Sequence, residues 1–232
     1  IAAAADAGAD VIVVDHHTAG PELPPAFAMV NPNRLDESGA LGTLAAVGVA
    51  YLLVIATNRA LRASGWYGGG RPEPDLLQWL DLVALGTVCD VVALTGLNRA
   101  MVAQGLKVMA ARGNAGMAAL ADVARVTTPP GAYHAGFVLG PRVNAGGRVG
   151  RAGLGARLLA TDDAAEANVL ALELDGYNTE RREIEARVLE AAREQVEVAG
   201  DPGPLVFAAG EGWHPGGIGI VASRLTGAWR RP

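Results

Sequence analysis

Short apolar runs and longer helical stretches alternate in the opening part of the chain. Residues 1–8 predict the end of a helix that Gly8 closes, and the Val-Ile-Val-Val run at 11–14 has the composition of a buried parallel strand. After a Pro-rich loop, residues 27–30 predict a second short strand, and residues 41–63 predict a mostly apolar, buried helix. We interpret this part as a β-α-β-α arrangement, which indicates an α/β fold.

Helical periodicity continues through the middle of the chain. Residues 66–74, which include three consecutive glycines, predict a loop, and residues 87–90 predict a turn. The helices predicted here cover residues 75–85, closed by Gly86, residues 98–112, capped by Asn98, and residues 116–125. The Pro-Pro-Gly sequence at 129–131 indicates a domain boundary after these helices.

The last part of the chain predicts a long charged helix and the start of another α/β unit. From residue 162 to about 198, Ala, Leu, Glu and Arg recur at helical spacing, interrupted only by Gly176. Pro202 and the residues after it end this helix, and residues 205–209 predict a strand. We therefore predict a partial parallel-sheet α/β domain, an interdomain loop with a long connecting helix, and the start of a second, smaller α/β domain. Their bounds are 1–128, 129–200 and 201–232.

The composition limits the classes of protein to which the chain can belong. Half of the residues are apolar and 5% are aromatic, which is typical of a soluble globular protein. Because 19 Lys plus Arg oppose 24 Asp plus Glu, the overall charge gives no support for a nucleic-acid partner. Cys89 is the single cysteine, and we find no signal peptide and no apolar run of about eighteen residues. We expect a cytoplasmic protein that has no membrane partner.

Both ends of the sequence indicate a fragment. The first residue is Ile1 rather than Met, the alanines that follow read as a helix already under way, and residues 229–232 carry no terminating signal. We expect apolar surface to be exposed at both ends.

A carboxylate and two imidazoles follow the first predicted strand. Asp15, His16 and His17 come directly after it, in the kind of loop where open α/β sheets bind ligands. These donors suit Mn, Fe, Zn and similar divalent ions, although histidine pairs are also common on surfaces. Asp90 could join them or could cap its own turn, because an unpaired carboxylate is costly to bury. By themselves these residues predict an incomplete metal site.

Two glycine-rich segments could contact phosphate. Residues 140–148 combine backbone freedom with two guanidinium groups, and residues 212–225 lead a glycine-rich turn into a helix whose first N–H groups could hold an anion. Ser223 and Arg224 could add side-chain contacts. The alternatives are a solvated linker for the first segment and close packing of small residues for the second. No G-x-S-x-G nucleophile elbow is present, which argues against Ser-His-Asp hydrolysis.

The order of these motifs resembles that of RecJ-type exonucleases, a branch of the DHH phosphoesterase family, over nearly the whole chain. The matching motifs are V-V-D-H-H-T at 13–18, N-P-N-R at 31–34, G-T-V-C-D-V-V-A-L at 86–94, G-P-R-V-N-A-G-G-R at 140–148, N-T-E-R-R-E at 178–183 and G-W-H-P-G-G-I-G-I-V-A-S-R-L at 212–225. The first and third are shared by DHH phosphoesterases in general. The fourth and the last together point more narrowly to the RecJ type.

The resemblance implies a metal site for two-metal phosphodiester hydrolysis. It assigns His16 and Asp90 as ligands of Mn²⁺ or Mg²⁺, with Asp90 able to bridge two ions. Asp15 would bind an ion or support the ligands, and His17 would face the scissile phosphate. His17 and Asp90 are therefore the expected catalytic residues.

The resemblance also implies a substrate-binding set. Arg142, Asn144 and Arg148 would lie near the cleft between the domains. The residues expected to hold the DNA strand or its terminal phosphate are His214, Gly216, Ser223 and Arg224.

The implied function is 5′-to-3′ exonuclease digestion of single-stranded DNA in repair and recombination, by a monomer with other repair proteins as partners. The family's amino-terminal part supplies further metal-binding aspartates, none of which precedes Ile1, and its second domain and oligonucleotide-binding fold would continue beyond Pro232. We therefore expect the fragment itself to be inactive.

Two other functions stay open. One is a DHH hydrolase of short oligonucleotides, cyclic dinucleotides or pyrophosphate, which would differ in its dependence on substrate length. The other is a non-catalytic nucleic-acid-binding or protein-interaction module, which would bind without metal-dependent turnover.

Overall fold

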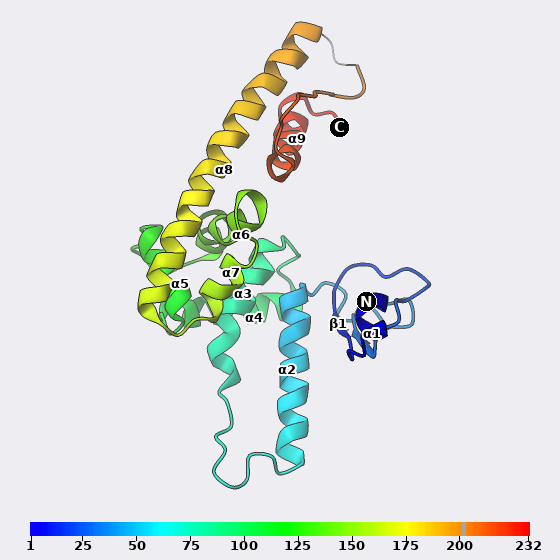
Figure 1. Cartoon of the computed structure of the whole chain (residues 1–232), viewed down its shortest axis with the longest axis vertical. Helices are drawn as coiled ribbons and strands as arrows, with labels where there is room; N and C mark the ends of the chain where they lie inside the picture. Colours follow the sequence, from blue (N-terminus) through cyan, green and yellow to red (C-terminus); the bar gives the residue numbers. More distant parts are fainter. Residues whose placement is uncertain (201–202) are drawn as a thin grey trace. The chain divides into compact units, whose positions relative to one another are not determined.

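The computed structural model describes residues 1–200 and 203–232, which form a mostly helical chain with a small parallel sheet (Figure 1). The elements in chain order are α1 (Ala2–Asp6), β1 (Ile12–Val14), β2 (Ala28–Val30), α2 (Ala46–Ala63), the 3₁₀ turn η1 (Leu76–Trp79), α3 (Leu80–Cys89), α4 (Gly96–Ala110), α5 (Ala115–Val123), the π-helical segment η2 (His134–Leu139), α6 (Gly140–Val149), α7 (Leu154–Ala160), α8 (Ala164–Ala199) and α9 (Pro215–Trp229). The α/β class predicted from the sequence is confirmed.

The chain divides into two compact units. The first unit contains residues 1–113 and 128–140, and the second contains residues 114–127 and 141–232. The three segments predicted from the sequence, with limits at 128/129 and 200/201, stay a prediction. The expected helix stop at Pro202 lies outside the described residues.

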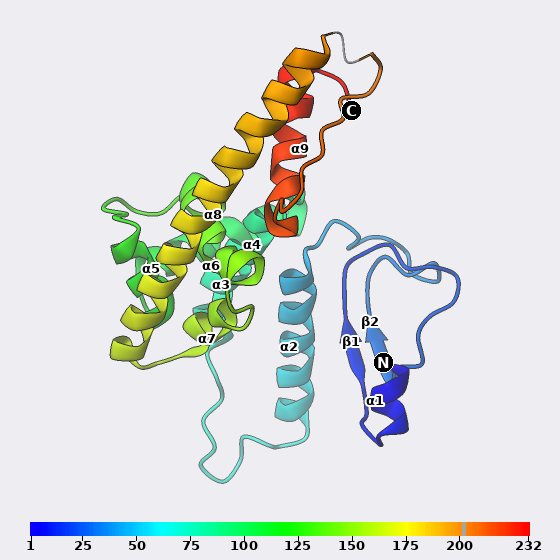
Figure 2. The same cartoon turned by 45° about the horizontal axis from the view of Figure 1, so that its top comes forward.

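The first unit contains a two-stranded parallel sheet. The register pairs Ile12 with Ala28, Val13 with Met29 and Val14 with Val30. The two strands lie side by side, with α2 beside β1 (Figure 2). The connection at 15–27 contains no helix, so the predicted β-α-β-α order is wrong, and the observed order is α1-β1-β2-α2. Because the strands are parallel and in register, their carboxyl ends coincide.

Helix α2 is shorter and more exposed than the sequence predicted. It begins at Ala46, and its buried residues are Gly48, Val49, Tyr51 and Asn58. It is the one described helix that is long and apolar enough to cross a membrane by length and composition, with a mean hydropathy of 1.3 over its 18 residues. This corrects the expectation that no such stretch exists. One helix of this kind is weak evidence, because the core helix of a soluble protein passes the same test.

Helix α3 runs through the glycine that was predicted to end it. A Cβ atom at Gly86 would lie 2.8 Å from Cγ1 of Val47, so glycine serves the close approach of these two segments. The helix continues to Cys89, and Asp90 is its C-terminal cap residue. The turn predicted at 87–90 is therefore the last turn of a helix. Apolar side chains of α3 join the core of the first unit, which contains Leu44, Val49, Tyr51, Leu80, Val83 and Met101.

Asn98 does not cap α4 as predicted. The helix begins at Gly96 after Thr95, and Asn98 lies in its first turn with only 1% of its surface exposed. Its side-chain amide donates hydrogen bonds to the backbone oxygens of Thr43, at 2.7 Å, and Ala93, at 3.0 Å. The amide therefore links the start of α4 to the segment before α2.

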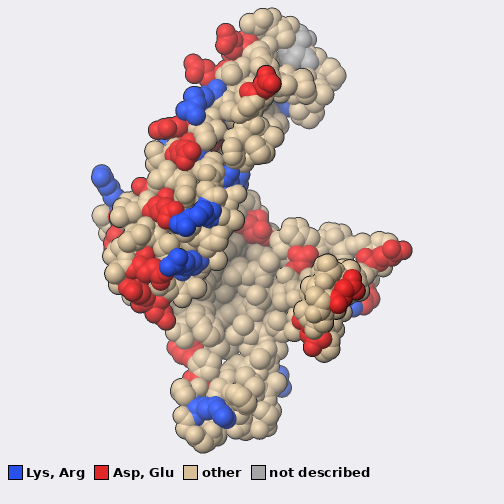
Figure 3. All heavy atoms as spheres, in the orientation of Figure 1, with Lys and Arg blue, Asp and Glu red and all other residues tan. Residues whose placement is uncertain are grey.

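Helix α8 is the longest element of the second unit and confirms the predicted long helix. The Asp163 carboxylate caps it by accepting hydrogen bonds from the backbone N–H groups of Ala165 and Glu166. Gly176 does not interrupt it. Charged side chains of both signs gather along this part of the molecule (Figure 3), as the i, i+4 charge pattern predicts.

Two predicted segments of the second unit have a different conformation. Residues 140–148, expected to be a phosphate-contacting loop or a linker, belong to helix α6. A Cβ atom at Gly146 would lie 2.8 Å from the backbone oxygen of Arg151, so Gly146 serves packing, whereas the position of Gly147 is open. Residues 205–209, expected to be a strand, pair with no strand among the described residues. The Val206 N–H group donates instead to the backbone oxygen of Pro232, at 2.8 Å.

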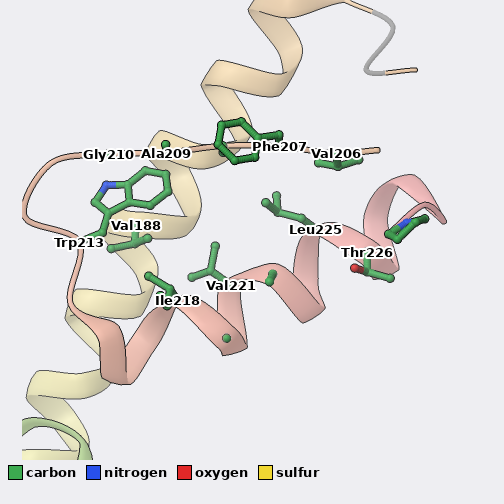
Figure 4. A pocket seen from close by; sticks show the side chains of 14 residues that line it. Val188, Val206, Phe207, Ala209, Gly210, Trp213, Ile218, Val221, Leu225 and Thr226 are labelled. Carbon is green, nitrogen blue, oxygen red and sulfur yellow. The ribbon is translucent and has the colours of Figure 1, made fainter. Parts of the chain in front are cut away.

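An apolar groove lies between residues 206–213 and helix α9 (Figure 4). The side chains of Val188, Val221 and Leu225 form a buried cluster against which Trp213 packs. Other apolar residues of the chain are exposed, including Phe207 at 77% and Ile12 at 57%. Exposed apolar residues thus occur near both ends of the sequence.

Replacement of Gly116 by alanine tests the packing of α5 on α7. A Cβ atom there would lie 1.8 Å from the backbone oxygen of Leu158, so we expect the free energy of unfolding to fall by about 2–3 kcal/mol. Gly176→Ala is the matched control, because that helical position is open. It should be neutral or raise stability by up to about 1 kcal/mol. Equal urea midpoints for the two variants would contradict the packing.

Replacement of Asp81 by asparagine tests a buried carboxylate at the start of α3. Burial raises the pKa of Asp81, whose surface is 2% exposed. A raised folded-state pKa means that stability is lost as the pH rises from the ordinary value of 3.8 through the folded value. Asp81→Asn should therefore resist urea better than the wild type at pH 7 and equally well below pH 3.8. The exposed Asp10→Asn control should show no such pH-dependent gain.

Candidate metal centre

The loop that follows β1 is organised by the Asp15 carboxylate. Oδ1 of Asp15 accepts hydrogen bonds from the backbone N–H groups of His16, at 2.7 Å, and His17, at 3.3 Å. The same oxygen lies 2.8 Å from Nδ1 of His17. The hydrogen bond with the His17 side chain is the main reason that the pKa of Asp15 lies below its ordinary value. Asp15 is therefore held as a carboxylate that fixes the loop and the His17 ring.

The side chains of His16 and Asp90 meet in the first unit. Nε2 of His16 lies 3.5 Å from Oδ2 of Asp90. His16 is mostly buried, with 15% of its side chain exposed, whereas Asp90 is 37% exposed. Asp90 reaches this position as the cap residue of α3, directly before Val91, whose φ of 60° lies in the left-handed region. The loop after β1 and the end of α3 thus present one imidazole and one carboxylate to the same space.

Two asparagines after β2 hold the backbone of the histidine loop. The Asn31 side-chain amide donates to the backbone oxygen of His17 at 2.9 Å, and that of Asn33 donates to the backbone oxygen of His16 at 2.6 Å. Asn33 also donates to the backbone oxygen of Gly42 at 3.0 Å, while its N–H group donates to Oδ1 of Asn31. Asn31 is buried, with 5% of its surface exposed. These bonds fix the direction in which His16 projects.

The donors at this position fit part of a divalent metal site. Imidazole nitrogen and carboxylate oxygen are ligands that Mn²⁺ accepts, and carboxylate oxygen also suits Mg²⁺. Within residues 1–200 and 203–232, no group of three or more His, Cys, Asp or Glu side chains gathers in a metal-binding arrangement. Asp15, which was expected to bind or support the metal, uses Oδ1 within its own loop. The described residues therefore offer an incomplete set of ligands.

Two further side chains adjoin His16 and Asp90 in the sequence, and they differ in exposure: His17 is exposed, whereas the Cys89 thiol is largely buried. The His17 side chain is 79% exposed, so with Nδ1 turned to Asp15 its other ring edge faces solvent. Burial raises the pKa of the Cys89 thiol, and Sγ lies 3.7 Å from the backbone oxygen of Ala135. A thiol with a raised pKa is a poor nucleophile, so Cys89 has a packing role.

Residues 1–87 match the model of the DHH family, N-terminal domain. The matched region includes the Asp15–His17 loop and both asparagines that hold it. This part of the chain is therefore similar to a DHH-family domain. The DHH part of the resemblance noted in the sequence is thereby confirmed over these residues, and Asp90 lies three residues beyond the matched region.

Curated proteins similar to this chain are named single-stranded-DNA-specific exonuclease RecJ. The protein from Dickeya dadantii is 44% identical over 97% of this chain, and that from Escherichia coli is 43% identical over 97%. The chain spans 40% of the length of each of these two relatives.

Solved structures of RecJ proteins have the same fold as this chain. RecJ from Thermus thermophilus in complex with Mn²⁺ matches with a TM-score of 0.82 and 38% identity, over 98% of this chain and 32% of that one. Another exonuclease RecJ, bound to manganese, matches with a TM-score of 0.80 and 36% identity, over 99% of this chain and 55% of that one.

The residues expected to bind substrate lie in the second unit of the chain. Nε of Arg142 donates to Oδ1 of Asp175 on α8 at 2.8 Å. Arg148 donates through NH1 to the backbone oxygen of Gly216 at 2.9 Å, and a Cβ atom at Gly216 would lie 2.6 Å from the backbone oxygen of Arg148. The structure thus joins Arg148 to the start of α9, and Gly216 has a packing role there.

The other expected substrate residues lie on or near α9 and α6. His214 caps α9, because its Nδ1 accepts the Gly216 N–H group at 3.0 Å. That contact occupies one of the N–H groups that the sequence offered to an anion. Arg224 forms an ion pair with Glu185, and the side chains of Ser223 and Asn144 are exposed.

Sequence reasoning gave no role to the asparagines of the N-P-N-R motif or to Glu185. Asn31 and Asn33 directly follow β2, at the edge where the Asp-His-His loop follows β1. Parallel pairing of two adjacent strands was the signal that could have joined them. Glu185 carried no comparable signal, because its charge looks like one of many on a solvated helix.

Replacement of Asn33 by alanine tests the anchoring of His16. We expect Mn²⁺ affinity of the protein at its natural length to fall by about tenfold, because an unanchored loop no longer fixes the imidazole. Isothermal titration with Mn²⁺ measures this. Asn168→Ala, an exposed asparagine on α8, is the control and should bind Mn²⁺ as the wild type does. Unchanged affinity in Asn33→Ala would show that the anchor is dispensable.

Proposed function

We propose that this chain supplies metal-binding and substrate-binding parts of an exonuclease that digests single-stranded DNA from 5′ to 3′ in repair and recombination. The observation that carries the proposal is the 3.5 Å approach of His16 to Asp90, in a DHH-family domain. Mn²⁺ or Mg²⁺ is the proposed cofactor, and the manganese-bound RecJ structures of the same fold support it. We further propose a cytoplasmic monomer that acts with other repair proteins.

In this proposal His16 and Asp90 bind metal, and Asp90 can bridge two ions. Two bound ions would supply an activated water and would stabilise charge on the phosphodiester. Asp15 orients the loop and the His17 ring, and the exposed edge of His17 faces the phosphate. Further ligands are needed to complete the site, because the described residues gather no group of three or more His, Cys, Asp or Glu side chains.

On the substrate side, we propose that guanidinium groups of the second unit hold the sugar–phosphate backbone. Arg142 and Arg148 are fixed by contacts to Asp175 and to the start of α9, and Arg224 is half-exposed. Asn144, His214, Gly216 and Ser223 complete the proposed set. Fixed arginines suit phosphate recognition, because less side-chain entropy is lost on binding.

The test is release of nucleotides from labelled single-stranded DNA in the presence of Mn²⁺, by the protein at its natural length. His16→Ala should lower the rate at least about 100-fold, because several kcal/mol of charge stabilisation depend on the metal. His134→Ala is the matched control, since His134 lies in the same unit but outside the proposed centre.

The outcomes separate the three functions considered from the sequence. The exonuclease is supported if His16→Ala loses digestion of single-stranded DNA while the wild type and the His134→Ala control keep it. Cleavage of dinucleotides but not of longer strands favours the short-oligonucleotide hydrolase. Binding of single strands without any metal-dependent turnover favours the non-catalytic module.

A further inference from the structure

Glu185 is a buried carboxylate shared by arginines from two helices of the second unit. Its side chain is 5% exposed, in the middle of α8. Oε2 lies 2.8 Å from NH1 of Arg181 on the same helix, and Oε1 lies 2.5 Å from NH2 of Arg224 on α9. Each carboxylate oxygen therefore has its own guanidinium partner.

The two arginines differ in exposure. The Arg181 side chain is 12% exposed, and it also donates through NH2 to Oδ1 of Asn178 at 3.1 Å. The Arg224 side chain is 56% exposed. Removing a carboxylate from water is costly, and here that cost is offset by the charge-assisted hydrogen bond from Arg181 and the ion pair with Arg224. The arrangement joins a buried carboxylate to an arginine whose side chain is more than half exposed.

Several arginines lie near the single carboxylate of Glu185. Burial is the main cause of the lowered pKa of Arg181, and the neighbouring positive charge of Arg148 adds to the lowering. Nε of Arg181 is buried and has no hydrogen-bond partner among the described residues. Other carboxylates of α8 are bound to other arginines, Asp175 to Arg142 and Glu173 to Arg151. The carboxylate of Glu185 is thus shared by two guanidinium groups, with a third positive charge close by.

We propose that Glu185 is a positioning residue for phosphate binding, which holds Arg224, braced by Arg181, in a fixed orientation toward a phosphate group of a single strand. This inference rests on the proposed function and assigns Glu185 a role in it. Glu185 itself would not touch the DNA. Glu185 would favour binding because it already holds the Arg224 side chain in the orientation that contacts phosphate, so that less conformational entropy is lost on binding.

Electrostatics alone gives the opposite expectation for a change at Glu185. Replacing the carboxylate with an amide makes the region more positive, which by charge alone would strengthen binding of an anion. Loss of positioning would weaken it, because a glutamine has only one oxygen and leaves one arginine without an acceptor. The sign of the change therefore separates the two effects.

The experiment measures binding of a fluorescent oligothymidylate by anisotropy, without divalent ions, to the protein at its natural length. Glu185→Gln should weaken binding on the order of tenfold, the loss of one charge-assisted contact. The slope of log affinity against log salt should fall by about 0.7, one phosphate contact on a single strand. Glu173→Gln is the control, since it breaks an ion pair on the same helix with the same change of charge. It should bind as the wild type or slightly more tightly.

Each outcome decides one of the two proposals. Binding by folded Glu185→Gln that equals or exceeds that of the wild type overturns the positioning role. Absence of oligothymidylate binding by the wild type overturns the proposed function instead. A uniform loss in both Glu185→Gln and Glu173→Gln also counts against positioning, because it would reflect general weakening of α8.

A second variant keeps the test open if Glu185→Gln does not fold. Arg224→Lys keeps the charge but cannot present two parallel donors to carboxylate and phosphate. It should weaken oligothymidylate binding severalfold, and unchanged binding would overturn the proposal. Where Glu185→Gln does fold, the losses in the double variant Glu185→Gln, Arg224→Lys should be less than additive, because Glu185 acts through Arg224.

Discussion

The candidate metal centre depends on the hydrogen bonds that two asparagine amides make to the backbone of the histidine loop. β1 and β2 are parallel and in register, so the loops that leave their carboxyl ends begin side by side. The carbonyl groups of His16 and His17 lie beyond the end of β1, and the amides of Asn33 and Asn31 supply their hydrogen-bond donors. A carboxylate could not donate these bonds. The two asparagines of the N-P-N-R motif therefore position the His16 imidazole indirectly, by holding the backbone of the loop that carries it.

Local sequence signals predicted the elements whose residue pattern is visible within one short stretch of sequence. The strands at 12–14 and 28–30 and the long helix α8 follow from apolar runs and helical spacing, and the placement of the Asp-His-His loop at a strand end follows from the first strand. Helix bounds near glycines were less predictable. Gly86 permits contact with Val47 instead of ending its helix, which depends on a partner distant in the sequence.

Segments whose conformation depends on tertiary partners could not be predicted in the same way. Residues 205–209 have the composition of a strand, but a strand requires a neighbour to complete its hydrogen bonds, and Val206 bonds to Pro232 instead. The glycines of α6 have low helix propensity, yet packing of Gly146 near Arg151 and Leu174 favours the helix. Tertiary contacts therefore explain why residues 205–209 form no strand and why the segment of α6 is a helix rather than a loop.

The distribution of charge shows why the net charge of −5 was a poor guide to partners. Along α8, Glu173 and Asp175 are each bound to an arginine from outside that helix, so their charges are locally balanced. Glu185 is bound to two arginines, and Arg148 lies within electrostatic reach of one of them. An acidic protein can therefore contain a locally basic site, because affinity for an anion depends on the charges within roughly a Debye length, about 8 Å at physiological salt. Pairing between helices, which composition does not record, sets that local balance.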